Sequence, residues 1–241
     1  MLSFIIPAHD EELLLGATLG SLHAAAVLIG ASYEVVVVDD ASTDSTASIA
    51  AANGARVISV NHRKIGAARN AGAQHATGAL LIFVDADTIV TEAILRSVVR
   101  AVRDGAIGGA ARVAFEGDMP VFARLMTGLW TLLQPVARLG TGCFFFCTRD
   151  AFQAAGRFDE TLYALEDLEL SRRLHRLGRF VILGEAIVTS GRNLRAHSTL
   201  DALRMLAGVI CEGRGFLKRR EGLNFWYGER PTSSRSPTRD R

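Results

Sequence analysis

The run EVVVV, Glu34–Val38, limits the possible folds more than any other segment of the chain. Its four consecutive valines would make a strand apolar on both faces, whereas a strand with one wet face alternates apolar and polar residues. A strand of this kind is stable when both faces are covered, as they are in the centre of a parallel sheet. The run therefore predicts a central parallel strand.

The first half of the chain alternates strand-like runs with helical segments. The expected strands are Ser3–Pro7, Glu34–Val38, Arg56–Val60 and Ala79–Val84. The expected helices are Leu13–Ile29, a helix to Ala52 with an N-cap signal at Ser42–Asp44, Ile65–His75, and Thr91–Arg103 capped by Thr91. This order predicts an α/β fold with a doubly wound, mostly parallel sheet and helices on both faces. Ligands of such sheets bind beyond the carboxyl ends of the strands.

The second half has a less regular pattern. Ile107–Phe115 and Cys143–Cys147 are expected strands, and Val121–Leu133, Arg149–Ala155, Glu166–Leu177 and Leu200–Arg220 are expected helices. The tail after Pro231 is rich in Ser, Thr and Arg and is expected to be disordered.

Charge balance and cysteine content limit the possible functions and the compartment of the protein. With 27 Lys and Arg against 25 Asp and Glu, the net charge of +2 is too balanced to predict nucleic-acid binding. Three cysteines without metal-site spacing indicate packed thiols in a reducing, cytoplasmic compartment.

Two intervals are poor in charge. Leu13–Tyr33 is long enough to span a bilayer, but it contains polar residues and glycines and lies between two runs that must pair, so we interpret it as a crossover helix. Leu125–Thr148 is interrupted by Pro135 and allows at most a peripheral membrane contact, which would be at the inner face of the cell membrane.

Asp85-Ala86-Asp87 is the sharpest local signal for chemistry. Two carboxylates one residue apart in an extended turn project to the same side, and oxygen ligands suit Mg²⁺ or Mn²⁺. Such a cation can neutralise a diphosphate leaving group. The alternative is a solvated acidic turn that caps the helix near Thr91.

Further candidates stand at other element ends. Asp39 and Asp40 end a strand and can accept hydrogen bonds from a base or a ribose. The alternative is that Asp44 and its neighbours cap the next helix and favour its dipole. Arg69 can contact a diphosphate or pair with a strand-end acid. Glu166 and Asp167 open a helix, where capping and general-base catalysis are both open readings.

Four strings in order resemble the family 2 inverting glycosyltransferases, whose fold is the nucleotide-diphospho-sugar transferase fold, GT-A. The strings are SFIIPAHDEE, YEVVVVDDASTDST, KIGAARNAGAQHATGALLIFVDADT and LEDLELSRRLHRLGR. The resemblance covers about residues 2–183. It implies one catalytic domain over residues 1–228, with a nucleotide-binding half at 1–113, an acceptor half at 114–228, and a disordered tail at 229–241.

The resemblance also implies roles for single residues. Asp167 would be the general base, supported by Glu166, and Asp85 and Asp87 would hold the metal, with Asp87 the more direct ligand. The partners would be a UDP- or GDP-sugar and a saccharide, lipid or small-molecule acceptor. The remaining residues would bind the nucleotide sugar: Pro7, His9, Glu11, Asp39, Asp40, Arg69, Asp85 and Arg192.

Two departures from the family pattern and three alternatives bear on the function. Asp10 stands where the family commonly has Asn, and the Q-x-x-R-W string of the processive synthases is absent, which favours addition of one sugar per encounter. A polyprenyl-phosphate sugar transferase is an alternative within the family, and a catalytically silent nucleotide-sugar-binding domain is another. Nucleotidyltransferases share the fold, but their first loop is Gly-rich and basic, whereas IIPAHDEE is acidic.

Overall fold

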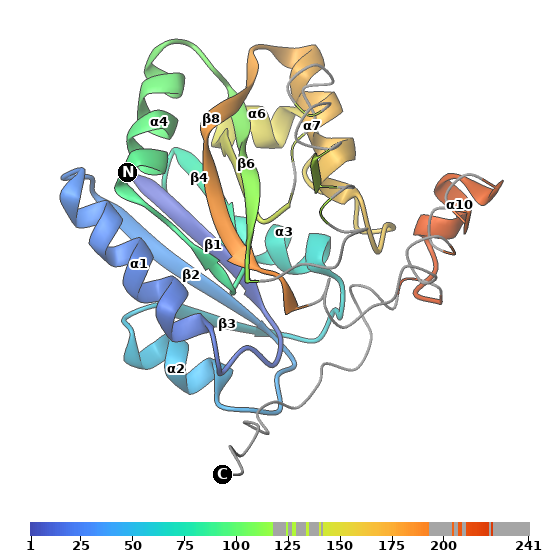
Figure 1. The fold of residues 1–241 in the computed structure, drawn as a ribbon, viewed down its shortest axis with the longest axis horizontal. Coiled ribbons are helices and arrows are strands. Elements are labelled where there is room, and N and C mark those ends of the chain that lie inside the picture. The colour runs from blue at the N-terminus through green and yellow to red at the C-terminus, as the bar shows by residue number, and fades with distance from the viewer. Residues whose placement is uncertain are drawn as a thin grey trace, which may run out of the picture.

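The computed structural model describes residues 1–117, 142–192 and 211–221, together with residues 124, 127–128, 134, 140, 204, 207–208 and 223. Its strands form one sheet in the order β3-β2-β1-β4-β7-β6-β8-β5 (Figure 1). The strands are β1 Leu2–Ala8, β2 Tyr33–Asp40, β3 Arg56–Val60, β4 Leu80–Val84, β5 Thr88–Ile89, β6 Gly108–Glu116, β7 Phe144–Thr148 and β8 Phe180–Ser190. The helices are α1 Leu15–Leu28, α2 Thr46–Ala52, α3 Ile65–His75, α4 Glu92–Arg103, α6 Arg149–Ala154, α7 Glu166–Leu177 and α10 Arg214–Leu217.

The predicted α/β fold with a mostly parallel sheet is confirmed. Strand β1 pairs in parallel with β2 and β4, and β2 pairs in parallel with β3. Strands β6 and β8 are also parallel, whereas β7 runs antiparallel between β4 and β6, and β5 runs antiparallel to β8. As the valine run predicted, β2 lies inside the sheet, and Val35–Val38 are all buried.

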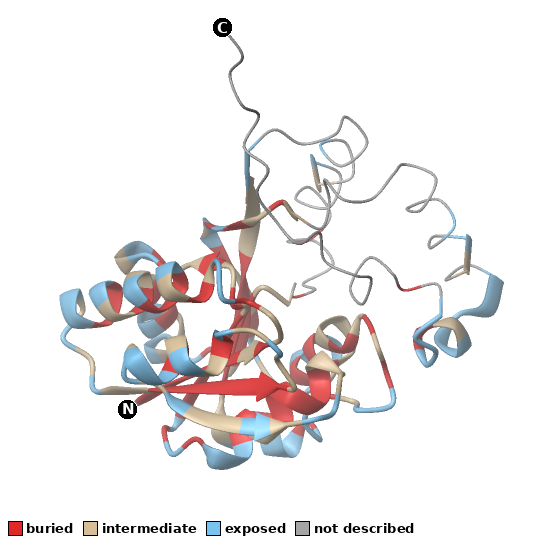
Figure 2. Cartoon of the chain, turned by 90° about the horizontal axis from the view of Figure 1, so that it is seen from below, coloured by how far each residue is buried: buried red, intermediate tan, exposed pale blue. Residues whose placement is uncertain are grey.

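Helices cover both faces of the sheet, which is why its strands are apolar on both sides. Along β1, Phe4 and Ile6 pack with α1, α2 and α4 on one face. Ile5, between them, packs with α3, α6 and α7 on the other. Figure 2 shows the buried strands between helices whose outer surfaces are exposed. Six phenylalanines, among them the buried run Phe144–Phe146 of β7, supply the largest of the fully buried apolar side chains.

The main departure from the predicted elements is β8, which the sequence pattern did not reveal. Gly184 and Glu185 interrupt its apolar run, and the pairing with β6 shifts register at this point, between Ala110 and Arg112. Such a bulge hides a strand from a search for unbroken alternation. The two-residue β5 is too short to leave a sequence pattern. Helix α2 begins at Thr46, later than its cap signal, and Asp44 accepts the Thr46 N–H at 2.9 Å.

Several predictions fall wholly or partly outside the described residues. These are the helix at 121–133, part of the helix at 200–220, and the tail at 229–241. The boundary expected between residues 113 and 114 lies inside β6, so the strands on either side of it belong to one sheet. Of the helices in the described part of the chain, none is long and apolar enough to cross a membrane.

Candidate functional site

The candidate acidic residues lie at one edge of the sheet, at the carboxyl ends of its parallel strands. Strands β2 and β4 flank β1 and run parallel to it, so the residues at their carboxyl ends gather on the same side. Asp39 and Asp40 end β2, and Asp85 follows β4 directly. Asp40 and Asp85 therefore lie at the same edge of the sheet.

Asp40 orders the loop between β3 and α3. Its carboxylate accepts the backbone N–H groups of His62 at 2.6 Å and Arg63 at 2.9 Å. These bonds hold Arg63 in the left-handed region, at φ 51°. Asp39 accepts the Ser42 N–H at 3.3 Å, so the two adjacent acids serve different loops. The Asp40 oxygens are thus engaged with backbone N–H groups.

The loop after β1 carries Pro7, His9 and Glu11 to the same edge. Pro7 is opposite Val38 in the sheet register, and His9 lies against the Arg63 guanidinium and 3.1 Å from Asp10. The backbone N–H of Glu11 donates to the Thr46 hydroxyl at 2.7 Å, which ties this loop to the start of α2.

Arg192 joins this loop to the Asp-x-Asp segment. Its guanidinium donates to Glu11 at 2.7 Å and to Asp87 at 3.3 Å, and Asp87 also accepts the Thr189 hydroxyl at 3.1 Å. Burial by itself would lower the pKa of Arg192, but the charges of Glu11 and Asp87 and the hydrogen bonds to them together outweigh burial, so the pKa is raised. The cation therefore stays charged between two carboxylates.

Arg69 is the buried centre of the site. Only 1% of its surface is exposed, and its guanidinium donates to Asp85 at 2.8 Å, to Glu166 at 2.6 Å and to the Gly142 carbonyl at 2.8 Å. Of the two sequence readings, pairing with a strand-end acid is the one observed. A cation held by two carboxylates and a carbonyl compensates for its own desolvation. Arg69 thereby joins the end of β4 to the start of α7.

The carboxyl groups around Arg69 have raised pKa values. Burial raises the pKa of Asp85 to about 6, although the Arg69 charge opposes this. Burial and the neighbouring Asp167 charge raise the pKa of Glu166 to about 7. Burial also raises the pKa of Asp167, against the pull of Arg69. Carboxyl groups with pKa values displaced toward neutrality, gathered at one edge of the sheet, are typical of catalytic sites.

Glu166 and Asp167 have different surroundings, although both open α7. Glu166 is 4% exposed and bound to Arg69, whereas Asp167 is only partly buried and accepts the Leu168 N–H at 2.8 Å. Glu166 is thus engaged inside the protein. Of the two carboxylates, Asp167 is the one that belongs to a partly exposed residue.

The donor set at the Asp-x-Asp segment fits a hard cation that is shared with a substrate. Asp87 lies close enough to Asp85 for its charge to contribute to the raised pKa of Asp85. In the described part of the chain, no group of three or more His, Cys, Asp and Glu residues gathers to hold a metal unaided. Mg²⁺ is commonly bound by one or two carboxylates together with substrate phosphates, so two carboxylates are sufficient ligands for a metal-diphosphate complex.

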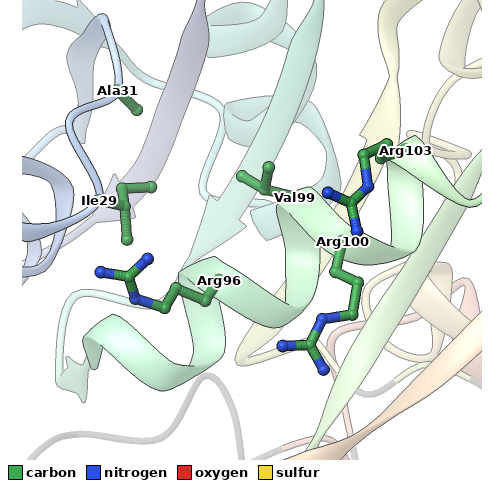
Figure 3. A pocket seen from close by; sticks show the side chains of 6 residues that line it. All are labelled: Ile29, Ala31, Arg96, Val99, Arg100 and Arg103. Atoms are coloured by element: carbon green, nitrogen blue, oxygen red, sulfur yellow. The ribbon is translucent and has the colours of Figure 1, made fainter.

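A surface pocket lies away from these residues. It runs along α4 from the end of α1, and Figure 3 shows Arg96, Arg100 and Arg103 around it. Ile29 and Ala31 line it just before β2 begins, so it is at the amino edge of the parallel strands. None of the sequence-predicted site residues lines this pocket.

Gly142 is a close neighbour of the buried centre, and its substitution tests the packing there. A Cβ at this position would be 2.9 Å from Arg69 Nη2 and 3.1 Å from Asp167 Oδ2. We expect Gly142→Ala to lower the free energy of unfolding by about 1–3 kcal/mol, the usual effect of overpacking. Denaturant unfolding measures this. Gly20→Ala in α1, where a Cβ meets nothing within 4 Å, is the control, and an equal loss in both variants would contradict the expectation.

Sequence reasoning missed several residues of the site. Thr189 and Gly142 have no motif of their own, because the first depends on β8 and the second on a close backbone approach. Asn70 follows Arg69 in α3, and no motif gives it a role. Its buried side chain accepts the Phe158 N–H at 3.1 Å and donates to the Phe158 carbonyl at 2.9 Å. Its unusual place on an otherwise small and apolar helix face was the available signal.

Solved structures of glycosyltransferases share this fold. S. aureus TarS, residues 1–349, in complex with UDP-GlcNAc, has a TM-score of 0.64 at 19% identity, covering 86% of this chain and 65% of that chain. The mannosyltransferase PcManGT from Pyrobaculum calidifontis, in complex with GDP-Man and Mn²⁺, has a TM-score of 0.68 at 18% identity, covering 86% and 60%. At such identities the likeness establishes the fold.

Curated relatives agree over part of the chain. An undecaprenyl-phosphate 4-deoxy-4-formamido-L-arabinose transferase from Klebsiella pneumoniae is 37% identical over 92 residues, which are 35% of this chain and 28% of the relative. The chain spans about half or less of the length of the curated relatives it matches. The profile of "Glycosyl transferase family 2" matches residues 3–156, from β1 to the end of α6. Because this match covers more than half of the sequence, the chain belongs to glycosyltransferase family 2.

Proposed function

We propose that the protein transfers one sugar from a UDP- or GDP-sugar to an acceptor hydroxyl, with inversion and with the help of Mg²⁺ or Mn²⁺. The observation that carries the proposal is the buried Arg69, which holds Asp85 from the nucleotide half beside the Glu166–Asp167 pair of the acceptor half. Inverting transfer needs a charge-stabilised leaving group and a base near one carbon, and this arrangement supplies both.

The donor would bind along the carboxyl edge of β1, β2 and β4. Pro7, His9 and Asp39 line the nucleoside position, and Asp87, assisted by Asp85, holds the metal. When bound, the metal neutralises charge that develops on the departing diphosphate. Arg192, which lies between Glu11 and Asp87, would contact the same phosphates.

The acceptor would be activated by Asp167. Its carboxylate takes the hydroxyl proton as the acceptor oxygen attacks the anomeric carbon from the face opposite the diphosphate. The bond from that carbon to the diphosphate oxygen breaks as the new bond forms, so the configuration inverts. Glu166 stays on Arg69 and sets the direction of the helix start.

A thermal-shift screen tests the donor side of the proposal. The protein is heated with UDP, GDP and other nucleoside diphosphates, each with and without Mn²⁺. A ligand that binds only the folded state raises the melting temperature, so we expect one base to give a shift that depends on Mn²⁺. If no nucleoside diphosphate shifts the transition with or without Mn²⁺, the protein does not bind this donor class.

The metal ligand can be tested by substitution. We expect Asp87→Asn to weaken Mn²⁺-dependent nucleotide binding by at least about tenfold, because a hard cation depends on the charge of its ligands, while the melting temperature without ligand changes little. Asp104→Asn, which changes an exposed acid at the end of α4, is the control. Equal nucleotide affinity in Asp87→Asn and the parent would show that Asp87 is not a ligand.

A polyprenyl phosphate is the second candidate acceptor. The Klebsiella pneumoniae relative is named as an undecaprenyl-phosphate transferase, and its similarity over 92 residues favours a polyprenyl phosphate as the acceptor. Transfer to a short-chain prenyl phosphate, compared with a saccharide acceptor, distinguishes the two. A protein that binds the nucleotide but turns over no donor with any acceptor would be the silent binding domain.

A further inference from the structure

The start of α7 is held in a conformation that its own residues do not favour. Leu165, the N-cap, has φ 60° and ψ 20°, and no side chain caps the helix. The left-handed region is costly for a residue with a Cβ, so it persists only where surrounding contacts impose it. Asp167 lies two residues further on. Whatever holds Leu165 therefore also sets the position of Asp167.

The C-terminal segment 211–223, of which residues 211–221 and 223 are described, supplies part of that hold through an apolar cluster. Leu217 and Leu223, which are 9% and 0% exposed, pack with Leu162 and Ala164 of the loop before α7, and Leu165 joins them. The Tyr163 N–H donates to the Leu217 carbonyl at 2.8 Å. The loop before α7 is thus packed and hydrogen-bonded against a segment some fifty residues later in the sequence.

Arg214 links the same segment to both sides of Leu165. Its guanidinium donates to Asp159 at 2.9 Å, on the loop, and to Glu169 at 3.0 Å, in the first turn of α7. Exposed ion pairs contribute little to stability, but two carboxylates on one guanidinium fix the geometry between them. Figure 1 shows α10, which begins with Arg214, outside the layers of the sheet.

The nucleotide half holds the same loop from the opposite direction. Lys64 donates to the Glu160 carbonyl at 3.1 Å and lies 4.3 Å from the centre of the Tyr163 ring, and Asn70 binds the Phe158 backbone. The body of the fold therefore fixes the start of the loop. Its end, where Leu165 turns into α7, is held on one side by the Arg69–Glu166 pair and on the other by the C-terminal segment.

We propose that segment 211–223 is a clasp that positions Asp167, and that Leu217 and Arg214 are its positioning residues. This inference rests on the proposed function, in which Asp167 accepts the acceptor proton. When the contacts of the clasp are lost, the left-handed backbone at Leu165 can relax. The Asp167 carboxylate then occupies its catalytic position for a smaller fraction of the time. Donor binding is expected to be unaffected, because its residues lie on α3 and at the carboxyl ends of β1, β2, β4 and β8, outside the loop that the segment contacts.

The test combines hydrogen exchange with kinetics in the full chain. Amide hydrogen exchange is measured in a peptide covering residues 159–169. We expect the exchange rate to rise on the order of tenfold in Leu217→Ala and by less in Arg214→Gln, because the loss of local contacts favours local opening. We expect kcat for transfer to fall with the exchange, while the Kd for the Mn²⁺-nucleotide complex stays within about twofold of the parent. Leu217→Met and Arg214→Lys restore both quantities in part.

The control is Arg219→Gln, which changes an arginine of the same segment that pairs with Glu212 and not with the loop. If exchange at 159–169 stays at the parental rate in Leu217→Ala, there is no clasp. If exchange rises but kcat does not change, the segment holds the loop without positioning the base, and the proposal is wrong. If the parent itself transfers no sugar, the proposed function fails, and the exchange arm still decides whether the clasp exists.

Discussion

Replacing Asp167 with Asn is expected to lower the rate of sugar transfer by about 10²–10⁴ while leaving nucleotide binding close to that of the parent. Asn keeps the shape of Asp and the bond from the Leu168 N–H, but it cannot accept a proton. Burial raises the pKa of Asp167, which makes it a better base than an exposed aspartate. The measurement is the transfer rate at saturating donor, alongside nucleotide affinity.

Two comparisons sharpen this test. Glu166→Gln removes the charge that Arg69 binds, so we expect a smaller loss of rate together with a loss of stability. Asp150→Asn, an exposed acid in the first turn of α6, is the matched control and should behave as the parent. If Glu166→Gln is inactive and Asp167→Asn is active, the general base is Glu166 and not Asp167.

The pH dependence of transfer follows from the same groups. A general base works in its deprotonated form, so the rate rises as pH increases through the pKa of the Glu166–Asp167 pair. Because burial raises both pKa values, that of Glu166 to about 7, the acidic limb lies above the ordinary carboxyl range near pH 4. A profile of kcat against pH measures the limb, and a limb near pH 4 would argue against a buried base.

Replacing Arg69 with Met is expected to lower the free energy of unfolding at neutral pH by about 3–5 kcal/mol. Arg69 is the cation between Asp85 and Glu166, and Met fills similar space without charge. Two largely buried carboxylates then face each other without a counterion. Urea unfolding measures the loss. Arg96→Gln, which breaks the exposed pair with Glu92, is the contrast, with less than about 0.5 kcal/mol expected.

The penalty of Arg69→Met depends on pH, with a sign that follows from linkage. Removing the cation raises the pKa values of Asp85 and Glu166 in the folded state further above their unfolded values. A folded acid with a raised pKa binds more protons than the unfolded chain, so stability falls as pH rises between those values. The deficit is therefore largest near pH 8 and smallest near pH 5. A deficit that is equal at both values would mean that lost packing, not unpaired charge, is the cause.

Much of the fold could be predicted because local patterns and tertiary structure agree in the first half of the chain. The valine run of β2 is apolar on both faces because helices cover both, and the Thr91 hydroxyl caps α4 as its place before the helix indicated. Strand β8 could not be predicted, because its pairing with β6 tolerates Gly184 and Glu185 in a bulge. Strand pairing over long separations leaves little local trace.

The candidate site was predictable as a set of residues and not as a set of contacts. The acids at the ends of β2 and β4 are placed together by topology alone. That Arg69 binds Glu166, 97 residues away, depends on how α7 packs against the sheet, which no spacing encodes. Likewise Arg192 meets Glu11 across 181 residues only because β8 ends beside the loop after β1.

The most direct test of the proposed function is release of the nucleoside diphosphate from a nucleotide sugar. The purified protein is incubated with UDP- and GDP-sugars and a panel of hydroxyl acceptors, with Mn²⁺ or with a chelator, beside Asp87→Asn and Asp167→Asn. Sugar transfer by this site predicts release from one donor class that requires the metal and is lost in both variants. Release that persists with chelator and in both variants would contradict it.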